Sequence, residues 1–124
     1  MKIKEIAAII ESFAPLSLQE SYDNAGLTLG NPEQEITQAL LCLDVTEAVI
    51  DEALGCGANL IISHHPLIFS GLKTITGRTY VERVVHKAIK HDIALYAAHT
   101  NLDSIQQGVN SIIARSWDWK IIRF

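Results

Sequence analysis

Apolar residues at helical spacing predict three amphipathic helices in this chain. Residues 1–13 place isoleucines on one side of a helix and charged residues around the other. Residues 79–91 place three valines, Ala88 and Ile89 on one face, with lysines in the last turn, where they complement the helix dipole. A third helix is predicted over residues 104–115, with Ser104 and Gln107 in capping-box register at its start.

Three uninterrupted apolar runs have the length of strands. They lie within residues 39–43, 59–63 (Asn-Leu-Ile-Ile-Ser) and 93–97, and their apolar character is typical of buried parallel strands. Asp44 follows the first run and resembles the N-cap of a further helix, which would end near Leu54. The chain therefore alternates between strands and helices after its first helix.

This order of elements indicates a single α/β domain over residues 1–124. We expect a mostly parallel or mixed sheet with helices on both of its faces. Residues 27–30 form a short apolar piece, residues 67–77 are expected to be mainly loop, and residues 121–124 resemble a last strand.

The composition fits a folded domain and narrows the class of function. Apolar residues make up 48% of the chain, which excludes disorder, and the net charge of −4 argues against a broad basic surface for nucleic acid. No apolar run approaches the roughly 20 residues of a membrane helix. Glu5 and Glu11 interrupt any signal-peptide core, so we expect a cytoplasmic protein. Cys42 and Cys56 are predicted to be reduced core residues.

Polar side chains follow each of the three predicted strands. Asp44 follows the first, the pair His64-His65 follows the second, and His99 and Asp103 follow the third. Ligands of open α/β sheets bind beyond the carboxyl ends of the strands. Two neutral imidazoles with a carboxylate suit a divalent transition metal, so His64, His65 and Asp103 are candidate ligands.

Several of these residues have a second interpretation. Asp103 precedes the helix predicted from the next residue and could serve as its cap, and Asp44 could serve only as an N-cap. His99 could be a metal ligand, a general base or a residue that orients a ligand. His86 and His91 lie among lysines on a predicted helix and are expected to be solvated surface groups.

Four stretches together resemble the Nif-three-like dinuclear metal-centre proteins, also known in bacteria as GTP cyclohydrolase 1 type 2 homologues. The resemblance covers essentially the whole chain, and the order and spacing of the stretches also match. They are Glu20-Ser-Tyr-Asp-Asn-Ala-Gly26-Leu27, Leu43-Asp44-Val45-Thr46, Leu60-Ile-Ile-Ser-His64-His65-Pro66-Leu67-Ile68-Phe69 and Ala98-His99-Thr100-Asn101-Leu102-Asp103.

The resemblance implies an α/β fold and a cleft that holds two divalent metal ions per chain in the intact family, such as Zn, Fe, Mn or Mg. Its ligands from the first half of the family sequence would be His64, His65 and Asp103, with His99 close by as the candidate catalytic residue. The family's other ligands form a C-terminal H-x-x-x-E motif that this chain lacks. We therefore expect an N-terminal half, either a fragment or a natural truncation, with an incomplete metal site.

Two functions follow from this resemblance. The first is a metal-dependent hydrolase that acts on a nucleotide-like substrate, with His99 moving a proton. The second is a non-catalytic module for protein interaction or oligomerisation, because the family is associated with protein partners and with ring-shaped hexamers. We expect a homo-oligomer and no nucleic-acid or membrane partner.

Overall fold

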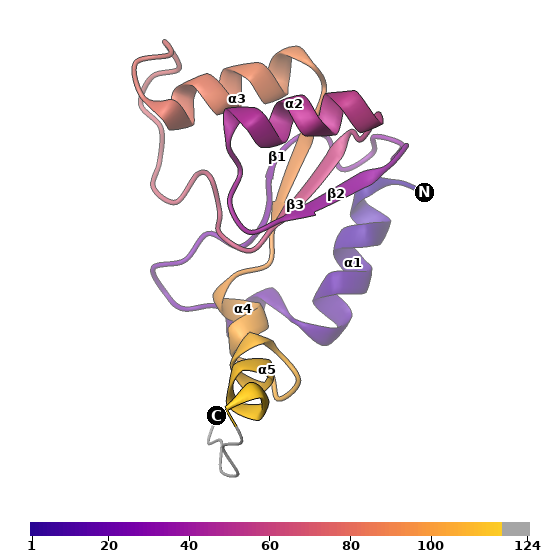
Figure 1. Cartoon of the computed structure of the whole chain (residues 1–124), viewed down its shortest axis with the longest axis vertical. Coiled ribbons are helices and arrows are strands. Elements are labelled where there is room, and N and C mark those ends of the chain that lie inside the picture. The colour runs from indigo at the N-terminus through magenta and orange to yellow at the C-terminus, as the bar shows by residue number, and fades with distance from the viewer. Residues whose placement is uncertain (118–124) are drawn as a thin grey trace.

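The structure, a computed structural model, describes residues 1–117 and holds a four-stranded sheet (Figure 1). The strands are β1 (Gly26–Leu29), β2 (Ala39–Cys42), β3 (Leu60–Ser63) and β4 (Ala94–Ala97). The α-helices are α1 (Ile3–Phe13), α2 (Glu47–Cys56), α3 (Tyr80–Lys90), α4 (Thr100–Asp103) and α5 (Val109–Ser116), and a short 3-10 helix, η1, covers Leu16–Leu18.

The sheet is mixed, in the spatial order β1-β4-β3-β2. β2, β3 and β4 run parallel, whereas β1 pairs antiparallel with β4. The predicted α/β fold is thus confirmed. The short apolar piece 27–30 supplies most of β1, which sequence analysis did not recognise as a strand.

Alternate residues of the central strands pack on opposite sides of the sheet. Ile61 and Leu95 join the core beneath α2 and α3, and Leu60 and Tyr96 join the core against α1. Figure 1 shows α1 on one side of the sheet and α2 with α3 on the other. Helices cover both faces as predicted, because a strand buried on both sides needs an apolar layer on each.

The helix predicted over residues 104–115 is confirmed only in its later part, because α5 covers Val109–Ser116, and its predicted start at Ser104 is wrong. Ser104 is the C-cap of α4, with its hydroxyl donating to the Thr100 carbonyl, and α5 begins only after its N-cap, Gly108. A Cβ at Gly108 would lie 1.8 Å from the carbonyl oxygen of Leu102, so the chain turns back on itself closely here. The helical periodicity continued across a turn that only glycine accommodates.

Burial at β2 also differs from the prediction. β2 is an edge strand of the described sheet, and Leu41 is 75% exposed. Cys42 is only partly buried and Cys56, in the last turn of α2, is exposed, so neither is a fully buried core residue.

The strand predicted at residues 121–124 lies outside the described residues. Within residues 1–117, no helix combines the length and apolar character needed to cross a bilayer.

Candidate metal centre

Three histidines meet where β3 and β4 end. His64 and His65 follow β3 directly, and His99 follows β4 by two residues. Because these parallel strands are neighbours, their carboxyl ends open at the same edge of the sheet. One ring nitrogen from each histidine lies within 4.8 Å of the others, and the ring centroids are 5.0–5.5 Å apart.

Each imidazole is held through its Nδ1 atom by a different acceptor. Nδ1 of His64 lies 2.8 Å from the Ala98 carbonyl oxygen, and Nδ1 of His65 lies 2.7 Å from an Asp44 carboxylate oxygen. A proton on Nδ1 leaves the Nε2 lone pair of a neutral imidazole free for a metal ion. The contacts therefore fix the tautomer that a metal ligand needs.

Asp23 performs the same task for His99, at 2.8 Å from Nδ1, with its side chain fully buried. Burial alone would raise the pKa of Asp23. Hydrogen bonds from the Thr100 hydroxyl, from His99 and from the backbone amides of Asn24 and Thr100 outweigh this effect and leave the pKa lowered. Asp23 is therefore a carboxylate at neutral pH and accepts the hydrogen bond at Nδ1 of His99.

Asp103 lies at the end of α4, with a carboxylate oxygen 3.7 Å from Nε2 of His64. It does not cap α5, whose N-cap is Gly108 and which begins at Val109, so its interpretation as a helix cap is wrong. All four candidate residues named from the sequence thus lie at one corner of the molecule. Their roles as ligands and proton carrier stay predictions.

The interpretation of Asp44 as the N-cap of α2 is also wrong. The N-cap is Thr46, whose hydroxyl accepts from the Val49 amide at 3.2 Å. Asp44 instead orients His65, although it is 61% exposed. Sequence analysis missed this role and that of Asp23. Asp44 carried a signal, since it follows a strand, whereas Asp23 lies on a connecting loop and is recognisable only within the family-like stretch that contains it.

This donor set fits a divalent transition metal. Two nitrogens that bind one tetrahedral zinc ion at about 2.1 Å lie about 3.4 Å apart. The imidazole nitrogens lie within 4.8 Å of one another, so binding would draw the three rings closer together. Asp103 would add a negative charge beside them. Imidazoles favour Zn and Fe over Mg, which prefers oxygen ligands.

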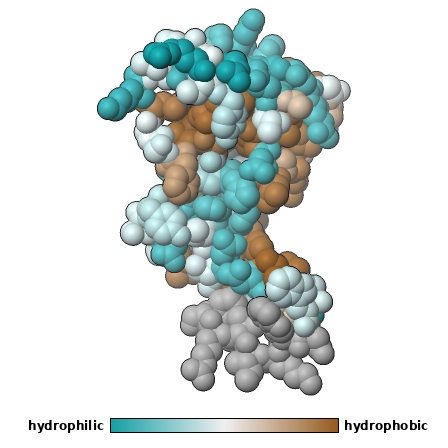
Figure 2. All heavy atoms as spheres, turned by 60° about the vertical axis from the view of Figure 1, so that its left-hand side comes forward, coloured by the Kyte–Doolittle hydropathy of each residue, from teal (hydrophilic) through white to brown (hydrophobic). Residues whose placement is uncertain are grey.

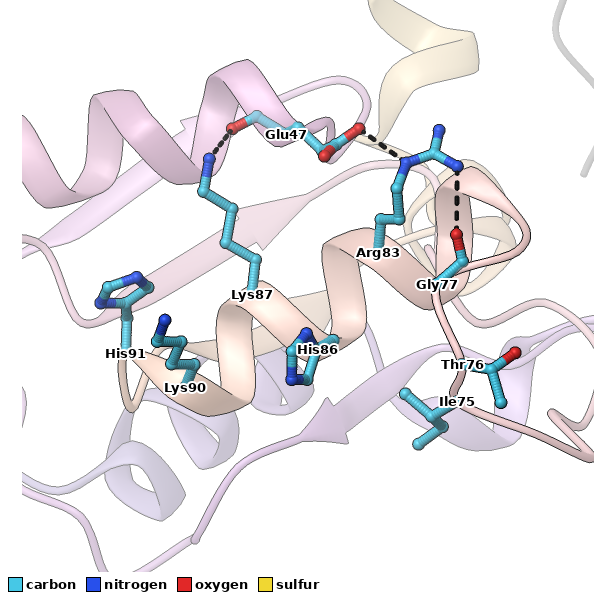
Figure 3. A pocket seen from close by; sticks show the side chains of 9 residues that line it. All are labelled: Glu47, Ile75, Thr76, Gly77, Arg83, His86, Lys87, Lys90 and His91. Carbon is cyan, nitrogen blue, oxygen red and sulfur yellow. Dashed lines mark hydrogen bonds and ion pairs between the residues drawn. The ribbon is translucent and has the colours of Figure 1, made fainter.

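A hollow of about 450 Å³ runs along α3, away from the three histidines, and is lined mainly by charged and polar side chains (Figure 3). Its lining includes Arg83, Lys87 and the exposed His86 and His91, as predicted for these two histidines. Figure 3 shows Arg83 and Lys87 reaching from α3 toward Glu47, which contacts both. Figure 2 shows hydrophilic side chains gathered over the top of the molecule, the end at which Figure 1 places α3. Within the described residues, this hollow brings no metal-binding cluster together.

A family model described as Duf34/NIF3 (NGG1p interacting factor 3) matches residues 1–123. The chain belongs to the DUF34/NIF3 family. This membership confirms the resemblance drawn from the four sequence stretches.

Curated members of the DUF34/NIF3 family are similar over most of this chain. A GTP cyclohydrolase 1 type 2 homolog from Clostridium perfringens is 50% identical over 113 residues, which are 91% of this chain and 43% of the relative. A protein with the same name from Streptomyces coelicolor is 38% identical over 122 residues, 98% of this chain and 43% of the relative. This chain therefore spans less than half the length of these relatives.

Solved NIF3 structures share the fold. Staphylococcus aureus protein SA1388 superposes with a TM-score of 0.88 at 43% identity, over 93% of this chain and 33% of that one. Reduced HcgD from Methanocaldococcus jannaschii superposes with a TM-score of 0.86 at 37% identity, over 95% of this chain and 47% of that one.

Proposed function

We propose that this chain binds a divalent transition-metal ion through His64 and His65, with Asp103 as a carboxylate ligand and His99 beside them. One observation carries the proposal. Three imidazoles converge, each with its Nδ1 atom held by a separate acceptor, and one ring nitrogen of each lies within 4.8 Å of the others. Histidines that serve only in packing need no such common orientation.

The chemistry we propose is metal-dependent hydrolysis. A bound divalent ion would lower the pKa of a water molecule and polarise a carbonyl at this corner of the molecule. His99 is the residue suited to move a proton, because the buried Asp23 carboxylate accepts a hydrogen bond from its Nδ1 atom and holds the ring in place. His99 is only 18% exposed, so most of its ring is shielded from bulk water.

A nucleotide-like substrate is part of the proposal and rests on the relatives. They carry the name GTP cyclohydrolase 1 type 2 homolog, and a cyclohydrolase opens a ring by adding water. The described residues supply enough donors for one ion. The second ion expected in the intact family would need further ligands, so we propose one ion for this chain. A cytoplasmic location remains our prediction.

The test of the hydrolase function is turnover of GTP by the metal-loaded chain. Opening of the purine ring changes its ultraviolet absorbance. We expect a rate that disappears on treatment with EDTA, returns with Zn²⁺, and is absent from His64→Ala at every metal concentration. GTP that stays intact with the zinc-loaded protein, or turnover that EDTA leaves unchanged, would contradict a metal-dependent cyclohydrolase.

A second function, a module for self-association, is favoured by the edge of the sheet. β2 has no partner beyond β3 within the described sheet. Leu41 and Leu43, on and just after this strand, are 75% and 60% exposed. An apolar edge strand is a template for pairing with another chain, and we propose a second copy of this chain as its partner.

A further inference from the structure

Two aromatic side chains stand exposed beside the three histidines. The Phe69 ring packs edge-on against His99, with ring centroids 6.3 Å apart, and Tyr22 packs against Phe69 at 6.4 Å. Phe69 is 48% exposed and Tyr22 is 64% exposed. Leaving two large aromatic rings in water forgoes the stabilisation that their burial would bring.

The loops that carry these rings are firmly held. On one loop, Leu67 and Ile68 pack into the core beneath α2 and α3, although the next residue, Phe69, stays outside. The side-chain amide of Asn24 donates to the Ile68 carbonyl at 2.6 Å and joins the two loops. Tyr22 precedes Asp23, which is anchored to His99 and Thr100. The rings are therefore presented on a fixed backbone.

We propose that Phe69 and Tyr22 form a stacking surface for the planar heteroaromatic ring of the substrate, of which a purine is an example. The two rings are too close and too tilted to enclose a third ring between them, at 6.4 Å and 48°. A ligand ring therefore stacks on the open face of Phe69. Because Phe69 touches His99, this position holds the ring next to the residue proposed to move the proton.

The choice of ligand follows from the chemistry of this surface. Every nucleobase has a π-face, and stacking on an aromatic side chain needs no base-specific hydrogen bond. Phe69 offers no hydrogen-bonding group, so it selects for a flat ring rather than for a particular base. The inference rests on the proposed metal-dependent hydrolysis beside His99. It adds the residues that position the substrate ring.

The test compares two probes that differ only by the ring. Guanosine 5′-monophosphate and ribose 5-phosphate share a sugar and a phosphate, and binding of each is measured by calorimetry with zinc-loaded and with EDTA-treated protein. We expect Phe69→Ala to weaken binding of the nucleotide by about tenfold or more and to leave ribose 5-phosphate unaffected. Phe69→Trp should restore nucleotide binding, and Tyr22→Leu should cause a smaller loss.

Phe13 provides a matched control. It is a phenylalanine at the end of α1 with a similar exposure of 53%, and none of the aromatic contacts around the histidines involves it. Phe13→Ala should bind both probes as the wild type does. Equal binding of the nucleotide by the wild type and Phe69→Ala, no nucleotide binding by the wild type, or equal loss of both probes would overturn the stacking surface.

The metal content of each variant separates this inference from the proposed function. We expect Phe69→Ala to hold as much zinc as the wild type, since Phe69 offers no ligand atom. If the wild type binds no zinc, and Phe69→Ala still binds the nucleotide more weakly than the wild type does, the metal centre is refuted and the stacking surface is supported. A change in oligomeric state in Phe69→Ala would instead make this surface a contact between copies and overturn the inference.

Discussion

Asp23 and His99 lie 76 positions apart in the chain and 2.8 Å apart in the fold. The buried carboxylate accepts a hydrogen bond from Nδ1 of the imidazole and further hydrogen bonds from the amide and hydroxyl of Thr100. One side chain thus ties the loop before β1 to the start of α4 and fixes the orientation of a candidate site residue.

Replacing Asp23 by Asn should weaken metal binding although the shape of the side chain is kept. An amide presents an N–H where the carboxylate accepted one, so His99 is driven to the tautomer that carries its proton on Nε2. An N–H group of His99 beside the proposed ligands opposes a cation, so we expect zinc affinity to fall by about tenfold or more. Competition with a chromophoric zinc chelator measures the change.

Asp44→Asn is the matched control for this prediction. Asp44 holds His65 in the same way but is 61% exposed, so water can replace the contact. Its effect on zinc affinity should be smaller than that of Asp23→Asn, with circular dichroism confirming that both variants fold. Equal affinities in the wild type and Asp23→Asn would show that this carboxylate does not prepare His99 for the site.

Glu82 should make stability depend on pH. It is 6% exposed and accepts hydrogen bonds from the amide and hydroxyl of Thr76 and the amide of Arg78, which lower its pKa to about 2. The folded-state pKa lies below the ordinary value of 4.5, so this carboxylate stabilises the fold above about pH 4.5. The contribution is lost as the pH falls toward 2.

The variant Glu82→Gln isolates this contribution. Its free energy of unfolding, measured in urea, should be lower than that of the wild type at pH 7. The difference should shrink progressively below pH 4.5, as the wild-type carboxylate becomes protonated. A difference that is constant from pH 7 to pH 3 would show that the charge of Glu82 is not what holds the loop before α3.

Three glycine-to-alanine variants should separate steric from conformational effects. At Gly30, with φ of +118°, a Cβ would lie 2.6 Å from Cβ of Ala94 in the sheet, so we expect a loss of about 3 kcal/mol. Gly57, with φ of +76° and nothing nearby, should lose only about 1 kcal/mol. Gly55, inside α2, should gain up to about 1 kcal/mol.

Denaturation in urea ranks these three variants directly. The order of stability should be Gly55→Ala, then Gly57→Ala, then Gly30→Ala. If Gly30→Ala proves as stable as Gly57→Ala, then β1 and β4 do not approach each other as closely as described.

Self-association through β2 should depend on its exposed leucines. Leu41→Glu places a charge on the sheet edge, where it would be buried in any strand-to-strand contact, so a dimer should shift to the monomer. Light scattering coupled to size-exclusion chromatography measures the mass. Ile112→Glu, on α5 at 60% exposure, is the control and should leave the mass unchanged. A mass that both variants leave at the wild-type value would exclude β2 as the interface.

The sequence predicted the elements whose signals are local. Residues 59–63, 79–91 and 93–97 were recognised because a buried strand and an amphipathic helix each carry their periodicity within a few residues. For the helix over 104–115 only the later part is confirmed, and its start was misplaced for a tertiary reason. The backbone at Gly108 lies close to the carbonyl oxygen of Leu102 in a turn that precedes α5. The spacing of apolar residues along the chain carries no information about such a contact.

The residues of the candidate site also fall into two groups, those with a local sequence signal and those that only the tertiary fold brings together. His64, His65 and His99 could be found because they directly follow strands that had been predicted. Asp23 could not be found from spacing, since only the completed sheet brings its loop beside His99. Asp44 was visible but was given a local role, because an acidic residue before a helix ordinarily caps it.

The most direct test of the central claim is the metal content of the purified chain. Elemental mass spectrometry of the wild type, His64→Ala and the surface control His86→Ala gives the number of ions per chain. We predict about one zinc or iron ion in the wild type and in His86→Ala, and none in His64→Ala. A wild-type chain that stays free of metal after incubation with Zn²⁺, or a His64→Ala variant that retains its ion, would contradict the metal centre.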